Sequence, residues 1–227
     1  MDDVVPERID RFARLVGPAS DGIVAEMDAY AEKTGFPTVG PAVGGWLRLL
    51  ARVLDAERVF EFGSGFGYSA YWFAGALPGD GRVVLTEFDE ERCERAERYL
   101  ERGGYADRTV IERGDALEIV DAYDGPFDVV LIDNEKERYA EAFEAVRGKV
   151  APGGVVVADN AVTAGPMDFD ALIELAAGED VETDDATRGV AEYLAAVRAA
   201  EEFETGLIPL GEGLAVSHRT GTVSNKR

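Results

Sequence analysis

The chain has little of several residues on which common active sites and anchors depend. Its 227 residues include one cysteine, Cys93, and one histidine, His218. A single cysteine excludes an intrachain disulfide and a CxxC metal site, and one histidine in a terminal strand candidate leaves nothing for a zinc site or a histidine-based triad. No apolar run approaches the roughly 18 residues of a membrane-spanning helix. The acidic start MDDVVPERID lacks the apolar core of a secretory signal, so we expect a cytoplasmic protein without a membrane partner.

Positive charge is also scarce. Lys and Arg number 23 against 45 Asp and Glu, which gives a net charge of −22. Such a surface repels nucleic acids and anionic membranes. The lysines are only four, namely Lys33, Lys136, Lys149 and Lys226. Excess carboxylate with scarce lysine favours a surface adapted to molar salt, and an acidic mesophilic protein is the alternative. Salt adaptation would make the acidity general, so a nucleic acid partner is disfavoured but remains an alternative.

The hydrophobic pattern predicts a single α/β domain over residues 1–227. Hydrophobic residues make up 46% of the chain, enough for a sizeable core. Residues 1–55 are predicted to be a helical segment, residues 56–219 an α/β core, and residues 220–227 a frayed tail. The helices expected in the first segment lie at 9–16, at 21–30 after a cap at Ser20 or Asp21, and at 46–54.

Alternating strands and helices fill the core. The predicted strands are 58–62, 82–86, 109–112, 128–132 and 154–158, and the predicted helices are 67–77, 89–102, 115–122 and 136–149. This alternation predicts a doubly wound, mostly parallel sheet with right-handed crossovers. After a region of loop and helix up to about residue 200, the segments 203–208 and 213–218 flank a Pro/Gly turn. We expect them to form an antiparallel hairpin at the sheet edge.

A glycine-rich turn follows the first strand. Gly63, Gly65 and Gly67 allow a sharp turn and a close approach to a ligand, although a tight turn without a ligand is the alternative. The GxGxG spacing differs from the GxGxxG of dinucleotide binders. Glu87 ends the next strand, 24 residues after Gly63, where a carboxylate can accept both ribose hydroxyls of a nucleoside. The glycine turn and Glu87 together predict a nucleoside-binding site.

Two further acidic positions lie close to that turn. Glu61 lies inside the first strand, where an unpaired carboxylate is costly to bury. It is predicted either to face water or to meet a cationic ligand, such as the amino group of a methionine moiety. Asp115 and Ala116 follow the third strand and could meet an adenine amine, or Asp115 could simply cap a helix.

Polar side chains end the fourth and fifth strands. Asp133 follows the fourth strand, and Asp159 and Asn160 follow the fifth. Neighbouring parallel strands bring these oxygens to the crevice where α/β sheets bind ligands, so they predict a site for Mg²⁺, Mn²⁺ or Ca²⁺, with helix caps as the alternative. Lys136, three residues after Asp133, either forms a salt bridge to Asp133 or Glu137 or acts as a general base.

Taken in order, the segments FEFGSGFGYSA, TEFDEE, GDALEIV, FDVVLIDNEKERY and PGGVVVADN resemble a known family. They are similar to the cation-dependent O-methyltransferases of the catechol and caffeoyl-CoA type, which use S-adenosylmethionine. The resemblance covers roughly residues 35–219. It implies a Rossmann-like class I methyltransferase domain with a seven-stranded sheet whose last strand is antiparallel, and it implies a homodimer.

The resemblance also implies roles for individual residues. It makes Asp133, Asp159 and Asn160 the metal ligands, and it makes Lys136 and Asp133 the catalytic residues. The cofactor positions that it matches are Thr38, Val39, Glu61, Gly63, Ser64, Ser69, Glu87 and Ala116, and it places Asp133 near the amino-acid end of the cofactor. Gly65, Phe88 and Asp115, which neighbour these residues in the sequence, complete the expected cofactor-binding set.

Three positions depart from the family pattern. Glu135 stands where the caffeoyl-CoA type has an aspartate, Ala164 stands where that type has a polar substrate contact, and Pro209 falls near the position where the catechol type has a metal-side carboxylate. The expected reaction is methyl transfer to a hydroxyl of a small aromatic acceptor with two adjacent oxygens. The alternatives are a methyltransferase for a hydroxylated uridine in tRNA and a non-catalytic cofactor-binding protein.

Overall fold

The computed structural model describes residues 5–165 and 167–221. At its centre is a seven-stranded sheet with the order β3-β2-β1-β4-β5-β7-β6. Strands β1 to β5 pair in parallel, and β7 is antiparallel to both β5 and β6. The predicted fold is therefore confirmed. The strands are β1 Arg58–Phe62, β2 Arg82–Glu87, β3 Thr109–Arg113, β4 Phe127–Ile132, β5 Val150–Ala158, β6 Phe203–Ile208 and β7 Leu214–Arg219.

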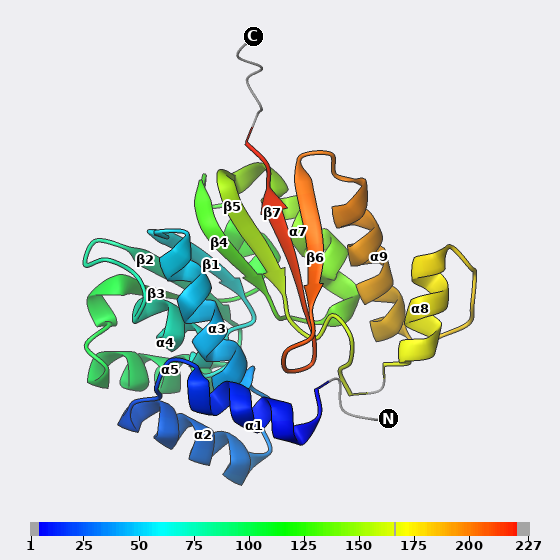
Figure 1. Cartoon of the computed structure of the whole chain (residues 1–227). Coiled ribbons are helices and arrows are strands. Elements are labelled where there is room, and N and C mark those ends of the chain that lie inside the picture. The colour runs from blue at the N-terminus through cyan, green and yellow to red at the C-terminus, as the bar shows by residue number, and fades with distance from the viewer. Residues whose placement is uncertain (1–4, 166, 222–227) are drawn as a thin grey trace.

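Side-chain alternation along the strands supplies two cores, one on each face of the sheet. Val59 and Leu131 belong to one core, whereas Phe60 and Ile132, their neighbours in sequence, belong to the other. The first core is covered by helices α2 Gly22–Thr34, α3 Gly40–Val53, α4 Tyr68–Ala74 and α5 Glu90–Arg102. The second is covered by α6 Ala116–Val120, α7 Tyr139–Val146, α8 Phe169–Ala177 and α9 Asp185–Ala199. Figure 1 shows α3 and α7 on opposite sides of the sheet.

The N-terminal helices differ in detail from the sequence prediction. Asp21, not Ser20, caps α2, because its carboxylate accepts the backbone N–H groups of Ile23 and Val24. Helix α3 begins six residues before the predicted start, at Gly40, because Pro41 fits the first turn of a helix.

Strand β5 is longer than predicted. It begins at Val150, whereas the Pro152-Gly153 pair favours a turn in the sequence. The register between β4 and β5 shifts between Phe127 and Val129, and this irregularity accommodates the extra residues.

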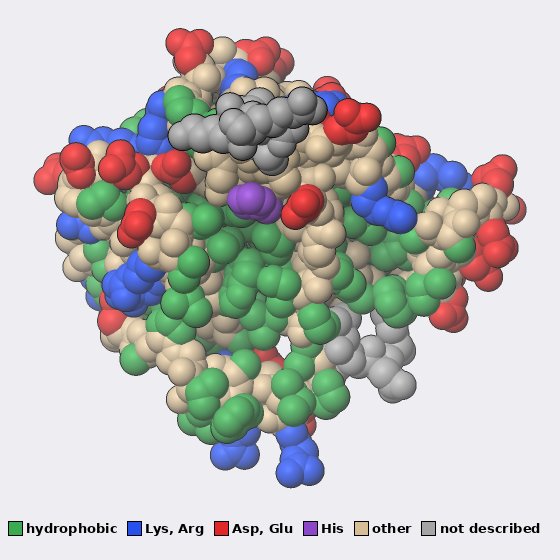
Figure 2. All heavy atoms as spheres, turned by 45° about the horizontal axis from the view of Figure 1, so that its top comes forward, with side chains coloured by type: hydrophobic (Ala, Val, Ile, Leu, Met, Phe, Trp, Pro, Cys, Tyr) green, Lys and Arg blue, Asp and Glu red, His purple; other side chains and the backbone are tan. Residues whose placement is uncertain are grey.

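The surface combines many acidic side chains with exposed apolar ones. Helix α1 Glu7–Val16 exposes Ile9, Phe12, Leu15 and Val16. Figure 2 shows an apolar area beside the single histidine, with acidic side chains around it.

The homodimer stays a prediction. No helix within residues 5–165 and 167–221 combines the length and apolarity needed to span a bilayer. Most of the predicted tail, residues 222–227, lies outside the described residues.

Candidate functional site

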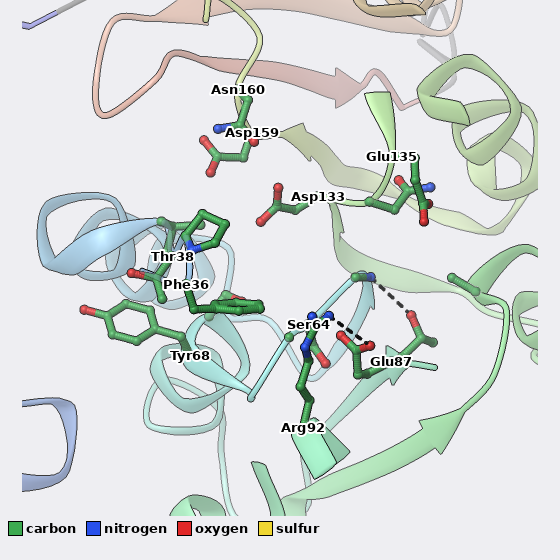
Figure 3. A pocket seen from close by; sticks show the side chains of 18 of the residues that line it. Phe36, Thr38, Ser64, Tyr68, Glu87, Arg92, Asp133, Glu135, Asp159 and Asn160 are labelled. Carbon is green, nitrogen blue, oxygen red and sulfur yellow. Dashed lines mark hydrogen bonds and ion pairs between the residues drawn. The ribbon is translucent and has the colours of Figure 1, made fainter. Parts of the chain in front are cut away.

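A cavity of about 740 Å³ lies at the carboxyl ends of β1, β2, β4 and β5. Every predicted site residue except Glu61 lines it. Asp133, Asp159 and Asn160 gather on one side, and Ser64, Glu87 and Arg92 lie on the other (Figure 3). The fold therefore brings together two sets of residues that lie up to 96 positions apart in the sequence, the separation of Ser64 and Asn160.

The glycine turn forms the floor of the cavity. Gly63 has a φ of +77°, and a Cβ there would lie 2.5 Å from the backbone oxygen of Asp133. Only glycine fits such a position without strain. The Ser64 N–H donates to the Thr86 carbonyl over 2.9 Å, which ties the turn to β2. The Ser64 hydroxyl is buried and has no hydrogen-bond partner among the described residues, so it can bind a ligand.

Glu61 lies beneath this floor. It is completely buried, so the water-facing alternative is wrong. Glu61 lies two residues after Val59 on β1, so its side chain lies on the same covered face of the sheet. The Ser69 hydroxyl donates to Oε1, whereas Oε2 has no partner among the described residues. Burial raises the pKa of Glu61 to about 8, and the nearby Asp133 carboxylate adds to this effect. A buried carboxyl group with an unpaired oxygen suits a cationic ligand.

Glu87 is held at the end of β2. Its Oε1 accepts the Asp89 N–H over 2.9 Å and lies 3.6 Å from the Arg92 guanidinium. That guanidinium also stacks on Phe36, 4.8 Å from the ring centroid. Phe36 and Arg92 line the cavity, and neither was among the site residues predicted from the sequence.

Asp115 has two structural partners. It caps α6 through the Leu117 N–H, and it accepts a hydrogen bond from Arg138 over 2.9 Å. The Arg138 guanidinium lowers the pKa of Asp115. The helix-cap alternative is therefore confirmed, and the adenine contact stays a prediction. Phe88, which is 64% exposed, lines the same part of the cavity.

The two predicted metal-binding carboxylates follow adjacent strands. The Asp133 N–H donates to Phe62 O over 3.0 Å, and the Asp159 N–H donates to Ile132 O over 3.1 Å. Burial raises the pKa of both carboxyl groups, and the Asp133 charge further raises that of Asp159. Asp159 Oδ1 is buried and has no partner among the described residues. Two close carboxylates with an unpaired oxygen fit a hard divalent cation.

Lys136 is the basic group closest to these carboxylates. Its Nζ donates to Asn160 Oδ1 and to Tyr139 Oη, each over 2.6 Å, and it lies 3.3 Å from Asp133 Oδ1. The predicted salt bridge to Asp133 is confirmed. The ammonium group thus contacts two of the three predicted metal ligands.

Asn160 contributes the third oxygen. Among residues 5–165 and 167–221, no three His, Cys, Asp or Glu side chains form a group that could hold a metal ion, so the site depends on an amide oxygen. Asn160 has a φ of +53°, a conformation that asparagine tolerates better than most residues. Its Nδ2 donates to Glu212, in the turn between β6 and β7. Sequence analysis missed Glu212, although its place between Gly211 and Gly213 marks a tight turn.

Comparison with known proteins supports one family. A family model described as O-methyltransferase matches residues 23–220. The chain belongs to the O-methyltransferase family. It is 34% identical over 174 residues to a catechol O-methyltransferase of Niastella koreensis, covering 74% of this chain and 78% of that protein. A catechol O-methyltransferase of Mycobacterium tuberculosis is 32% identical over 163 residues, covering 70% and 74%.

The structural comparison agrees. The O-methyltransferase TomG from Streptomyces achromogenes, solved in complex with SAM, has a TM-score of 0.81 and 28% identity, covering 94% of this chain and 96% of that one. Two of the departures from the family pattern face the cavity of this O-methyltransferase. Glu135 and Ala164 line it, whereas Pro209 is not among its lining residues.

Proposed function

We propose that this O-methyltransferase transfers the methyl group of S-adenosylmethionine to a hydroxyl of a small aromatic acceptor that carries two adjacent oxygens. A divalent cation assists the transfer. The observation that carries the proposal is the convergence of Asp133, Asp159 and Asn160 in the same cavity as the glycine turn and Glu87. A nucleoside-binding side and a cation-binding side in one cavity fit a donor and an acceptor held together.

The donor occupies the side formed by β1, β2 and α6. Glu87 accepts the ribose hydroxyls, and Glu61 neutralises the amino group of the methionine moiety from below. Gly63, Ser64 and Gly65 let the backbone approach the ligand, and Ser69 holds Glu61. Thr38 and Val39 close the methionine end, whereas Phe88, Asp115 and Ala116 surround the adenine.

The acceptor occupies the other side. Asp133, Asp159 and Asn160 would hold Mg²⁺, or Mn²⁺ or Ca²⁺, through oxygen ligands. When bound, the cation lowers the pKa of the acceptor hydroxyl and fixes its neighbouring oxygen. Acceptors with a single isolated hydroxyl are then poorer substrates.

Lys136 carries the proton. Its Nζ lies 3.3 Å from Asp133 Oδ1 and 2.6 Å from Tyr139 Oη, so it stands beside the proposed cation site, where an unprotonated amine accepts the hydroxyl proton. The acceptor oxygen then forms a bond to the methyl carbon while the carbon–sulfur bond breaks in line. The electron pair of that bond stays on sulfur, so the sulfonium becomes a neutral thioether.

The tRNA alternative finds little support on the basic face of α5. Arg95 and Arg98 pair with glutamates one turn away, and Arg102 pairs with Glu26. Paired arginines make a solvated face and not a continuous strip for phosphates. The non-catalytic alternative would not account for the unpaired buried oxygen of Asp159 in the same cavity as Asp133 and Lys136.

A side-by-side assay tests the proposal. The protein is incubated at high KCl with methyl-labelled S-adenosylmethionine and Mg²⁺, and it is offered a panel of catechols, matched monophenols, and unmodified or hydroxylated tRNA. We expect label in catechols above monophenols. Label in tRNA with none in any catechol would refute the proposed acceptor and favour the alternative.

A further inference from the structure

We infer that Glu212 is a positioning residue that fixes the amide of Asn160 with its oxygen toward the cation site. The inference rests on the proposed function, because it concerns the third ligand of the same site. The contact that carries it is the hydrogen bond from Asn160 Nδ2 to Glu212 Oε2. On the other end of the same amide, Oδ1 accepts from Lys136 Nζ over 2.6 Å.

The backbone places Glu212 firmly. The Ala161 N–H donates to Gly213 O over 2.8 Å, and the N–H groups of Val162 and Thr163 donate to Glu212 O over 3.2 and 3.1 Å. These three bonds join the β6–β7 turn to the residues that directly follow Asn160. The turn therefore moves with Asn160, and its carboxylate stays within reach of the amide.

The flanking glycines make this approach possible. A Cβ on Gly213 would lie 2.3 Å from a side-chain carbon of Val162, and one on Gly211 would lie 2.6 Å from Val43. Both glycines also have positive φ, +90° and +59° respectively. Larger residues at these positions would push the turn away, so the sequence Gly-Glu-Gly is suited to hold a carboxylate at this place.

An asparagine alone does not define which end of its amide faces a metal. The two ends have nearly the same shape, but only the oxygen can bind a cation. A carboxylate accepts hydrogen bonds and cannot donate them, so Glu212 selects the orientation in which the NH₂ group faces it. The opposite orientation would set two oxygens against each other at Glu212 and leave the NH₂ group at the cation site. Glu212 thus supplies orientation, as outer partners of metal ligands commonly do.

The composition of the chain makes the hydrogen bond directly observable. The sequence contains no glutamine and three asparagines, Asn134, Asn160 and Asn225. A ¹⁵N correlation spectrum of the metal-free protein should therefore show three pairs of side-chain amide protons, and Asn160→Ser identifies one of them. We expect the Asn160 pair to be shifted downfield by its charged acceptor and to lose this shift in Glu212→Ala. In Glu212→Asp the shift should return in part.

Metal affinity gives the second measurement. Mn²⁺ binding, followed by electron paramagnetic resonance without donor or acceptor, should weaken about 10- to 100-fold in Glu212→Gln, because an amide can donate as well as accept and no longer selects the orientation. Glu204→Gln is the matched control, since it removes one exposed charge from the same hairpin. Affinity for S-adenosylhomocysteine and the unfolding temperature should stay at wild-type values in both variants.

The outcomes separate the inference from the proposed function. An unshifted Asn160 pair in the wild type, or equal Mn²⁺ affinities in Glu212→Gln and Glu204→Gln, would overturn the role of Glu212 while the metal site stands. Unchanged Mn²⁺ affinity with a raised KM for the acceptor would also overturn it, in favour of direct contact with the acceptor. If the wild type bound no Mn²⁺ at all, the metal site itself would be refuted, and this inference with it.

Discussion

The two sides of the cavity differ in whether their charged side chains have partners within the protein. On the donor side, charged groups have partners: Glu87 accepts the Asp89 N–H, and Asp115 is bonded to Leu117 and Arg138. On the acceptor side, burial raises the pKa of both Asp133 and Asp159, the Asp133 charge raises that of Asp159 further, and one Asp159 oxygen has no partner among the described residues. The charged groups of the donor side are thus paired within the protein, whereas the acceptor side keeps a buried carboxylate oxygen for the proposed cation, with Lys136 as the cationic partner of Asp133.

The comparison has one instructive exception. Glu61 lies on the donor side, yet it carries the same kind of unpaired, buried oxygen as Asp159. Each unpaired oxygen is located where the proposed function places a positive charge, the methionine amino group at Glu61 and the metal at Asp159. Each unpaired oxygen lowers the stability of the free protein, and the proposed ligand at that point would restore it.

Removal of the metal should have the largest effect. We expect exhaustive EDTA treatment to abolish turnover and Mg²⁺ or Mn²⁺ to restore it. The reason is that, in the proposed reaction, the divalent cation lowers the pKa of the acceptor hydroxyl. The donor side should be indifferent, so binding of S-adenosylhomocysteine, measured by calorimetry, should persist in EDTA. Full turnover in EDTA would remove the proposed difference between the two sides.

Replacement of Glu87 should weaken binding on the donor side and leave the acceptor side unchanged. Hydrogen bonds to a charged acceptor contribute about 1.5–3 kcal/mol each, so Glu87→Ala should weaken S-adenosylhomocysteine binding at least tenfold. Mn²⁺ affinity should stay unchanged. Glu97→Ala, an exposed substitution on α5, serves as the control in the same calorimetric titration. A dissociation constant equal to that of the wild type would place the ribose elsewhere.

Glu61 predicts opposite effects of pH on stability and on donor binding. Its pKa is about 8 in the folded protein, against an ordinary value of 4.5. Between these values the folded chain holds a proton that the unfolded chain has lost, so this contribution to stability is full below pH 4.5 and disappears as pH rises to about 8. Above pH 8 it no longer changes.

Glu61→Gln has no such proton to lose. Its unfolding temperature should therefore gain on the wild type between pH 5.5 and pH 8.5, when both are followed by scanning calorimetry. Donor binding should behave in the opposite way, since the ionised carboxylate attracts the amino group: wild-type affinity rises with pH, and that of the variant does not. A difference in unfolding temperature that is constant across this range would contradict the buried-carboxyl account.

The effect of salt on the unfolding temperature should be the smallest per charge, because it is distributed over the whole surface. With a net charge of −22 and four lysines, the unfolding temperature should rise between dilute buffer and molar KCl. If the rise continues beyond about 0.5 M, where the Debye length is a few ångströms, the surface is adapted to high salt. A flat response beyond that concentration would indicate simple screening.

The sequence predicts the sheet well because its signals are local. Strands β1 and β6 have the predicted bounds, since each is a short alternating run closed by turn residues. The sequence does not predict the start of β5, because the register shift between β4 and β5 depends on strand pairing that the local sequence does not encode. The carboxyl ends of the strands then place Asp133 and Asp159 as expected.

The site was predicted less completely, since several of its contacts join distant segments. The pairing of Arg92 with Phe36 and of Glu212 with Asn160 depends on helices and turns that meet only in the folded chain. The burial of Glu61 was an open alternative, because alternation alone does not tell which face of a strand end is covered. Local patterns thus found residues that line the cavity, whereas the partners that hold them required the structure.

A crystal structure with S-adenosylhomocysteine, Mn²⁺ and a catechol would test the central claim most directly. We predict one anomalous scattering peak in contact with Asp133, Asp159 and Asn160, with both catechol oxygens on that cation and Lys136 moved from its contact with Asn160 to the acceptor. A structure with the donor bound, no anomalous peak, and Lys136 Nζ still between Asp133 and Asn160 would contradict the claim that these residues form a metal site.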